Sequence, residues 1–229
     1  MVALAVAALM SVALLTGCDA LGKLGAADHY PAARSFTVSG RVTTVVIDAD
    51  GGSVEVDGSS RSTVAVSQQA SYTSTAPVAR HVLSGTTLTL SYSCPSELSC
   101  RISYTVAVPR AVAVRVSAGA GAITLNSLSG AVTAQTSEGV IIADDLRSAA
   151  VSFKSDTGGI IATWSAVPSS VHASNDVGGV ALTVPGSVAY KISTRTIVGL
   201  STITVRQSAT SRYAISASSD LGSISISPG

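Results

Sequence analysis

Two kinds of short segment, each with alternating apolar and polar residues, recur through the second half of the chain. The first kind follows the pattern glycine, any residue, apolar, any residue, apolar. It starts at Gly121, Gly139, Gly158, Gly178 and Gly222, with a weaker copy at Gly199. In chain order these glycines are 18, 19, 20, 21 and 23 residues apart. Alternation with a period of two predicts β-strands that bury one face.

A second apolar pair lies between successive glycines and repeats with nearly the same spacing. Its members are Val112 and Val114, Val132 and Ala134, Val151 and Phe153, Val171 and Ala173, Tyr190 and Ile192, and Tyr213 and Ile215. Two strands in a unit of about 20 residues are typical of a β-solenoid, because one unit can bury its apolar face only against its neighbours. We therefore expect these pairs to point inward, the alternating residues Thr133, Ser152 and His172 to point outward, and the glycines to form corners.

Residues 36–110 use the same residue types less regularly. Longer alternating segments at Thr63–Gln69, Thr86–Ser91 and Ile102–Val108 look like antiparallel neighbours joined by turns. A protected end is needed, because a bare terminal strand invites aggregation. The sequence thus predicts an all-β fold. We expect an antiparallel, sheet-rich N-terminal cap over residues 36–110, followed over residues 111–229 by a right-handed parallel β-solenoid with rungs of about 20 residues.

The N-terminus has the pattern of an export signal. Residues 2–15 are apolar except Ser11, which is too short a run to span a bilayer but typical of a signal peptide. The following residues, Leu15-Thr16-Gly17-Cys18, resemble the bacterial lipobox, which implies cleavage after residue 17 and lipidation of Cys18. The alternative is an ordinary secretory peptide with a chance cysteine. No Lys or Arg precedes the apolar run, so we expect the true start codon to lie upstream.

On the lipobox interpretation, residues 1–17 are a signal peptide and residues 18–35 form a flexible tether, because the latter contain Gly, Ala and Pro without strand periodicity. The protein would then be anchored by lipid to the extracytoplasmic face of the cell membrane.

The two remaining cysteines, Cys94 and Cys100, lie between alternating segments at 87–93 and 101–108. This position predicts a hairpin loop that a disulfide closes, and the spacing of zinc-binding cysteines is missing. A loop this short would gain about 2 kcal/mol from the bond. Such a bond persists outside the cytoplasm, in agreement with export. The alternative is two small buried thiols.

Composition supports β structure and narrows the function. Glu and Lys, which normally fill exposed helix faces, occur three times each, and charged residues make up 12% of the chain. The net charge of +1 provides no basic field for nucleic acid. No hydrolase signature accompanies the histidines at positions 29, 81 and 172. We therefore expect neither enzyme activity nor a cofactor.

Two local features have candidate chemistry. The segment Asp48-Ala-Asp50-Gly51 resembles the start of a calcium-binding EF-hand loop, but the acid, glycine and glutamate required further along are missing, so we interpret it as a turn between strands. The single tryptophan, Trp164, either covers the edge of the solenoid core or offers an exposed platform on which a sugar or partner could stack.

A row of acids is the strongest candidate for a site. Asp156, Asp176 and Asp220 each lie two residues before a repeat glycine, and Glu138 lies one residue before its own. Asp156 and Asp176 belong to successive rungs, which places them about 4.8 Å apart. The favoured interpretation is turn chemistry, in which the carboxylates bond backbone amides. The alternatives are a Ca²⁺ site and an acid pair for glycoside hydrolysis.

The chain resembles the bacterial putative adhesins with β-strand repeats, a domain of unknown function frequent in actinobacterial lipoproteins. The resemblance rests on FTVSGRVTTVVIDADGGSVEVDG, on ISYTVAVPRAVAVRVSAGAGAITL and on the glycine repeats, in that order. It covers almost everything after the tether. It implies a parallel β-solenoid outside the membrane with adhesion as its presumed role, and it brings no catalytic residues.

The expected function is therefore that of a lipid-anchored adhesion, interaction or scaffold module whose partners are the membrane and a protein or glycan ligand, without nucleic acid. One alternative is a carbohydrate-binding or carbohydrate-active protein, since long sheet faces suit polymers, although aromatic residues make up only 4% of the chain. A regulatory envelope sensor is a third possibility.

Overall fold

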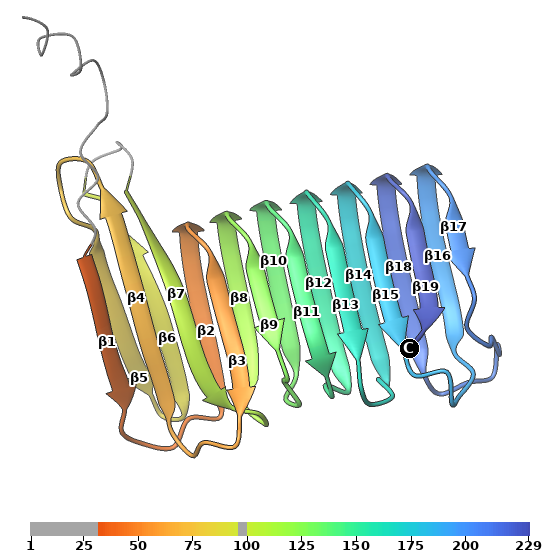
Figure 1. Cartoon of the computed structure of the whole chain (residues 1–229), viewed down its shortest axis with the longest axis horizontal. Helices are drawn as coiled ribbons and strands as arrows, with labels where there is room; N and C mark the ends of the chain where they lie inside the picture. Colours follow the sequence, from red (N-terminus) through yellow and green to blue (C-terminus); the bar gives the residue numbers. More distant parts are fainter. Residues whose placement is uncertain (1–31, 96–99) are drawn as a thin grey trace, which may run out of the picture.

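Two stacked β-sheets make up the protein, and their strands lie side by side along one long axis (Figure 1). The computed structural model describes residues 32–95 and 100–229. Neighbouring strands are parallel over most of the length, and the apolar core lies between the sheets. This arrangement confirms an all-β, solenoid-like fold. Within the described residues, no helix has the length and apolar character needed to cross a membrane.

The strands divide between the sheets as follows. In spatial order, the ten-stranded sheet contains β1 (Ala32–Val38), β4 (Val64–Tyr72), β7 (Cys100–Pro109), β3 (Val54–Ser59), β9 (Ile123–Asn126), β11 (Ile141–Leu146), β13 (Ile160–Trp164), β15 (Val180–Val184), β19 (Ile224–Pro228) and β17 (Ser201–Ile203). The nine-stranded sheet contains β16 (Lys191–Val198), β18 (Ala214–Leu221), β14 (Ser170–Val177), β12 (Ala150–Thr157), β10 (Val132–Glu138), β8 (Ala113–Ala120), β2 (Thr44–Gly51), β6 (Thr87–Ser93) and β5 (Val78–Ser84).

The repeated apolar residues point inward, as predicted. Val114, Val132, Val151 and Val171 are direct partners in β8, β10, β12 and β14, and each is at most 5% exposed. The apolar residues of the glycine-led strands, from Ile123 to Ile226, are buried in the same way against the other sheet. Each rung therefore buries its apolar face against its neighbours, which is the stabilising principle of a solenoid.

The repeat glycines form the corners at which the chain passes from one sheet to the other (Figure 1). Gly158, between β12 and β13, has a φ of 140°, a conformation that disfavours every residue with a Cβ. A Cβ added there would also overlap the carbonyl of Gly139 at the adjacent corner. The same stacking of corner on corner explains why glycine recurs once per rung.

The N-terminal region is partly as predicted. β4 pairs antiparallel with both β1 and β7, as expected for the segments at 63–69 and 102–108. The prediction for Thr86–Ser91 is wrong: this segment lies in β6 of the other sheet, antiparallel to β5 and parallel to β2. Alternation determines which face of a strand is buried but not the sheet to which the strand belongs. In addition, β1 begins at Ala32, inside the segment expected to be tether.

The last two rungs do not stack in chain order. β18 pairs with β14 on one side and with β16 on the other, so the final rung lies between two rungs that precede it in the chain. The connection between β15 and β16 is braced, because the Tyr190 hydroxyl donates to the Pro185 carbonyl at 2.8 Å within it. Arg206, which follows β17, donates to the carbonyls of Gly186 and Ser187 in the same connection.

The register of the last rung against β14 differs from the one that the repeated apolar pairs suggest. The partner of Val171 is Ile215 rather than Tyr213, a shift of two residues. A shift of two leaves the same face buried, so alternation alone could not reveal it.

Candidate functional site

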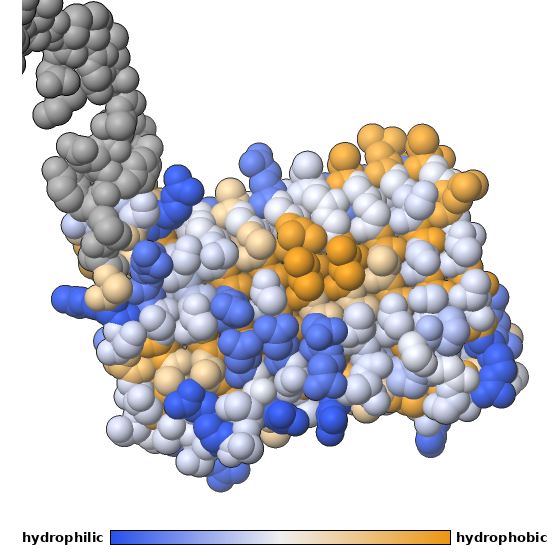
Figure 2. Space-filling model, in the orientation of Figure 1, coloured by the Kyte–Doolittle hydropathy of each residue, from blue (hydrophilic) through white to orange (hydrophobic). Residues whose placement is uncertain are grey.

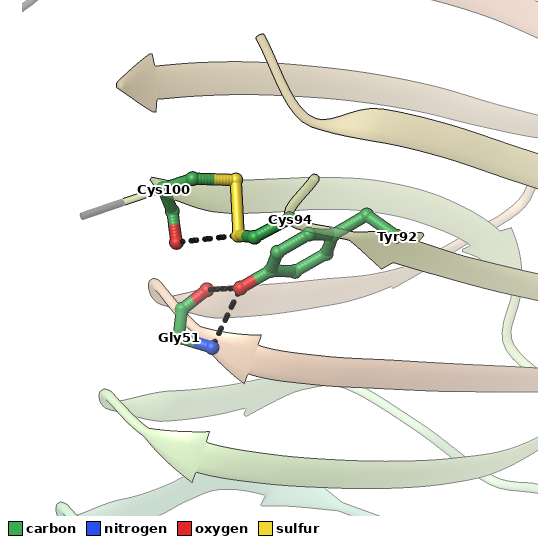
Figure 3. The surroundings of a disulfide bond; sticks show 4 residues. All are labelled: Gly51, Tyr92, Cys94 and Cys100. Atoms are coloured by element: carbon green, nitrogen blue, oxygen red, sulfur yellow. Dashed lines mark hydrogen bonds between the residues drawn. A yellow bond between two sulfur atoms is a disulfide. The ribbon is translucent and has the colours of Figure 1, made fainter. Parts of the chain in front are cut away.

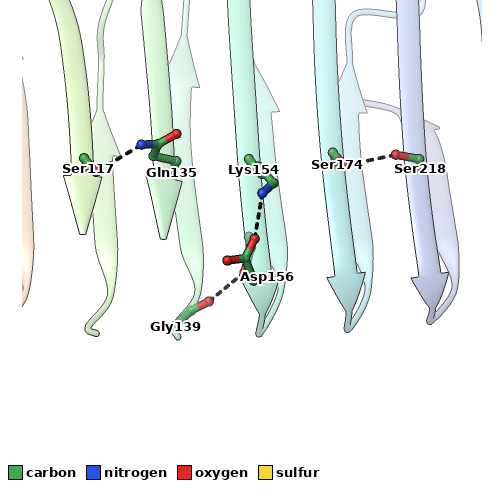
Figure 4. A network of polar contacts seen from close by, with 8 residues as sticks. Ser117, Gln135, Gly139, Lys154, Asp156, Ser174 and Ser218 are labelled. Carbon is green, nitrogen blue, oxygen red and sulfur yellow. Dashed lines mark hydrogen bonds and ion pairs between the residues drawn. The ribbon is translucent and has the colours of Figure 1, made fainter. Parts of the chain in front are cut away.

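The outer face of the nine-stranded sheet carries a row of short polar side chains (Figure 4). Ser117, Gln135, Lys154, Ser174 and Ser218 occupy equivalent positions on five neighbouring strands. The Gln135 amide donates to the Ser117 hydroxyl at 3.0 Å, and the Ser218 hydroxyl donates to that of Ser174 at 3.2 Å. A shallow depression of about 140 Å³ lies beside Gln135 and Lys154. This row of the face is polar and contains a small hollow.

The three predicted aspartates lie closer in space than the sequence indicated. Because β18 is inserted beside β14, Asp156, Asp176 and Asp220 occupy three adjacent strands in one row. The Lys154 ammonium pairs with the Asp156 carboxylate at 2.9 Å (Figure 4). The hydrogen bond and charge of Asp156, with a smaller contribution from the charge of Asp176, raise the pKa of Lys154. Asp156 is therefore partly neutralised by its own strand.

The corner hydrogen bonds come from other residues than the aspartates. One position earlier on each strand, a buried or half-buried polar side chain donates to the corner carbonyl of the adjacent rung. These bonds run from Ser155 to Gly139, from Asn175 to Gly158, from Ser219 to Gly178 and from Thr196 to Gly222 at 2.8 to 3.1 Å, and from Thr136 to Gly121 at 3.4 Å. Each bond satisfies a backbone carbonyl at a bend, where no strand partner is available. Within the described residues, the Asp176 and Asp220 carboxylates make no such bond.

The spacing of the aspartates on adjacent strands argues against a Ca²⁺ site. Within residues 32–95 and 100–229 no group of three or more His, Cys, Asp or Glu side chains converges as a metal site would require. Ca²⁺ needs about six oxygens at roughly 2.6 Å or less, whereas adjacent strands hold their side chains about 4.8 Å apart. The acids lie on an outer sheet face, in a row that runs across neighbouring strands.

We therefore expect that millimolar Ca²⁺ will leave the thermal midpoint of unfolding unchanged. Differential scanning fluorimetry with and without Ca²⁺ measures this directly. A ligand at about 100 times its dissociation constant would add about 2.7 kcal/mol of stability. A rise in the midpoint that Asp176→Asn abolishes would contradict the expectation and restore the calcium site.

A disulfide joins Cys94 and Cys100, as predicted, with their Cα atoms 5.8 Å apart (Figure 3). Its setting differs from the prediction, because Cys94 follows β6 in one sheet and Cys100 begins β7 in the other. The bond therefore links the two sheets instead of closing a hairpin. Beside it, the hydroxyl of buried Tyr92 accepts from the Gly51 amide and donates to the Gly51 carbonyl, both at 2.7 Å. Burial raises the pKa of the Tyr92 phenol.

The remaining candidates have different outcomes. Trp164 is 5% exposed and covers the core, so the interpretation of this residue as an exposed stacking platform is wrong. His172 points outward as predicted, whereas His81 lies in β5 with its ring 4.4 Å from that of Phe36. The prediction of a turn at Asp48–Gly51 is also wrong, since these residues belong to β2 and the corner follows them. Cys18 and His29 lie outside the described residues.

A feature that the sequence analysis missed is an exposed apolar ridge at the C-terminal end of the solenoid (Figure 2). We define the apolar ridge as Val177, Ile197, Val198, Leu200 and Leu221, which are 44%, 62%, 59%, 76% and 50% exposed. Val177, Leu221 and Val198 are direct partners on three adjacent strands, each one residue before a corner glycine. The insertion of β18 places Leu221 in the middle of these three.

The corner position changes character along the solenoid. The residues that precede the corner glycine are Glu138 and Thr157 in the middle rungs and become apolar at β14, β18 and β16. A second, smaller apolar group lies on the outer face of the ten-stranded sheet, where Ile142 and Ile161 are partners and are 38% and 49% exposed. The signal available in the sequence was the position before each repeat glycine, which is apolar in the last three rungs.

Comparison with known proteins identifies the fold. No family model matches the chain, and no curated protein matches its sequence. The crystal structure of a putative cell adhesion protein from Clostridium sporogenes superimposes with a TM-score of 0.57 at 14% identity, covering 87% of this chain and 100% of that one. The crystal structure of a putative adhesin from Bacteroides fragilis superimposes with a TM-score of 0.50 at 14% identity, covering 87% of this chain and 97% of that one. Likeness at such low identity shows the fold.

Proposed function

We propose that the chain is an adhesion and interaction module outside the cytoplasm, held at the cell membrane by a lipid on Cys18. We also infer that it is of the lipoprotein type that the putative adhesins of actinobacteria represent. The proposed ligand is a surface component of another cell, protein or glycan, that contacts the apolar ridge. The fold shared with proteins described as putative adhesins supports this proposal.

The apolar ridge is the observation that carries the proposal. Scattered exposed apolar residues are ordinary, but a contiguous group at one edge marks an interaction surface. Five residues contribute to the ridge, and three of them are adjacent in the strand register. A folded protein keeps such a surface in water at a cost, and contact with a partner removes that cost.

The carbohydrate-active alternative has less support. Trp164 is buried and offers no stacking surface to a sugar. Asp156, Asp176 and Asp220 lie on an open sheet face, whereas glycosidases hold their acid pair in a cleft around the substrate. The chemistry of the ridge favours a ligand with apolar surface of its own.

We further infer a right-handed solenoid with rungs of about 20 residues. Parallel strands joined by crossovers are right-handed in nearly all proteins. Partners in β8, β10, β12 and β14 follow one another after 18, 19 and 20 residues, as with Val114, Val132, Val151 and Val171. An experimental structure would test both properties.

Replacing Cys18 with serine is expected to move the protein from the membrane fraction to the soluble extracytoplasmic fraction without unfolding the solenoid. One acyl chain binds a bilayer only marginally, whereas two hold it firmly, and a lipobox cysteine receives at least two. Fractionation followed by immunoblotting measures the distribution, and Cys94→Ser serves as a cysteine control. A Cys18→Ser variant that still pellets with membranes would show that the lipobox interpretation is wrong.

The adhesive role is tested by placing a charge on the ridge. Cells that display the wild-type protein should attach to one another or to an alkyl-coated surface more than cells without it, and Val198→Asp should abolish the difference. Val82→Asp is the matched control, because Val82 is 56% exposed at the other end of the molecule. Equal attachment of wild-type and Val198→Asp cells would overturn the ridge as the adhesive surface.

A further inference from the structure

A pocket of about 430 Å³ opens between the two sheets at the N-terminal end of the molecule. One wall comes from β1, β4 and β7 of the ten-stranded sheet, and the other from the start of β5 and the residues before it. Ala70, Ile102, Pro77 and Ala79 make it mostly apolar. Its volume lies within the usual range of small-molecule sites, about 300 to 1,000 Å³.

Two polar side chains point into this space from positions where alternation calls for apolar ones. In β1 the inward positions hold Phe36 and then Arg34, and in β4 they hold Val66 and then Gln68. Arg34 and Gln68 are direct partners across the two strands, and both line the pocket. A local break in a consistent pattern often marks a functional position.

Protection of a sheet edge explains the inward position of Arg34 but not that of Gln68. Inward-pointing charges on edge strands prevent aggregation, and β1 is the edge of its sheet. Gln68, however, lies on β4, which is paired on both sides. A second reason is needed for a polar side chain on an interior strand that faces an apolar pocket.

Among the described residues, no Asp or Glu lines the pocket beside Arg34. The one ion pair within residues 32–95 and 100–229 joins Lys154 to Asp156, far from this end of the molecule. A guanidinium presents a fork of N–H donors that matches a carboxylate, and the amide of Gln68 adds a further donor. The pocket therefore combines apolar walls with donors for an anion.

The far end of the pocket is braced. Tyr72 and Cys100 are partners at the start of β7, and the disulfide to Cys94 ties this point to the end of β6 in the opposite sheet. Further along β1 and β5, the rings of half-buried Phe36 and exposed His81 contact each other with centroids 4.4 Å apart. Walls fixed in this way lose less conformational entropy when a ligand binds.

We propose that this pocket binds a carboxylate with an apolar chain, that is, a fatty-acid anion. The guanidinium of Arg34 and the amide of Gln68 hold the carboxylate, and the chain lies against Ala70 and Ile102. The pocket adjoins β1 and β5, at the opposite end of both sheets from β16, β17 and the apolar ridge. The proposal goes beyond adhesion and does not depend on it.

Calorimetric titration of the purified full chain with dodecanoate, below the concentration at which it forms micelles, tests the proposal. We expect saturable binding of one molecule per chain. Dodecanol, which has the same chain without the charge, should bind at least about tenfold more weakly, because charged hydrogen bonds are the stronger ones. Absence of saturable dodecanoate binding, or equal affinity for the two compounds, would overturn the proposal.

Variants locate the site. Arg34→Gln should weaken dodecanoate binding by roughly tenfold or more, since it removes a charged donor. Ala76→Trp, at an exposed position that lines the pocket, should obstruct it and weaken both compounds. Arg80→Gln is the matched control, because Arg80 is exposed on β5, between residues Ala79 and His81 that face the core side. An equal loss in Arg80→Gln and Arg34→Gln would show a general charge effect and contradict the assigned site.

Discussion

Replacing Phe153 with alanine is expected to lower the free energy of unfolding by about 3 to 5 kcal/mol, the usual range for a buried phenylalanine. Phe153 is fully buried on β12, in the middle of the nine-stranded sheet. Its direct partners on β10 and β14 are Ala134 and Ala173. Because short side chains flank the ring on both sides, the neighbours cannot move in to fill the cavity that its removal leaves.

Urea unfolding followed by circular dichroism measures this loss, and two further variants provide an intermediate and a small loss of stability for comparison. Breaking the bond between Cys94 and Cys100 should cost about 2 kcal/mol, because the loop that it closes is short. Val82→Ala, on an exposed side chain, should change stability by less than about 0.5 kcal/mol. A Phe153→Ala variant no less stable than Val82→Ala would mean that the ring does not lie in the core.

The second large effect is expected at a corner glycine. Gly158→Ala places a Cβ on a residue with a φ of 140° and against the carbonyl of Gly139. Such a backbone conformation costs other residues about 1 to 3 kcal/mol. Overpacking a close contact costs about 1 to 3 kcal/mol more. We therefore expect a loss of roughly 2 to 6 kcal/mol in the free energy of unfolding.

The adjacent residue provides the control. Gly159 has no positive φ, and a Cβ there would meet its nearest neighbour, the Gly179 carbonyl, at an ordinary contact distance of 3.6 Å. Gly159→Ala should leave stability nearly unchanged in the same urea experiment. If the two substitutions cost the same, the corner does not require glycine for its conformation and the repeat glycines need another explanation.

Within the repeats, the sequence pattern was sufficient to predict which residues face the core and where the corners lie. Alternation is a local property: neighbouring residues on a strand point to opposite sides, so the apolar ones from Val114 to Ile226 must share the buried side. The corner glycines were equally readable, because a bend that stacks on an identical bend excludes a Cβ. The disulfide partners followed from cysteine count and proximity in sequence.

The order of the strands at the two ends of the molecule emerged from the structure. Pairing depends on contacts between residues far apart in sequence, and a shift of two residues or an exchange of whole rungs leaves every local pattern unchanged. For this reason the insertion of β18 between β14 and β16 could not be read from the chain, nor could the division of β6 and β7 between two sheets.

The candidate sites depend on those same long-range choices. In the apolar ridge, the order of the strands places Leu221 between Val177 and Val198. The pocket at the other end forms because β1 and β4 extend one sheet while β5 extends the other, which brings Arg34 and Gln68 opposite Ala79. Alternation established the layers of this protein, whereas the order of its strands determined which surfaces it can use.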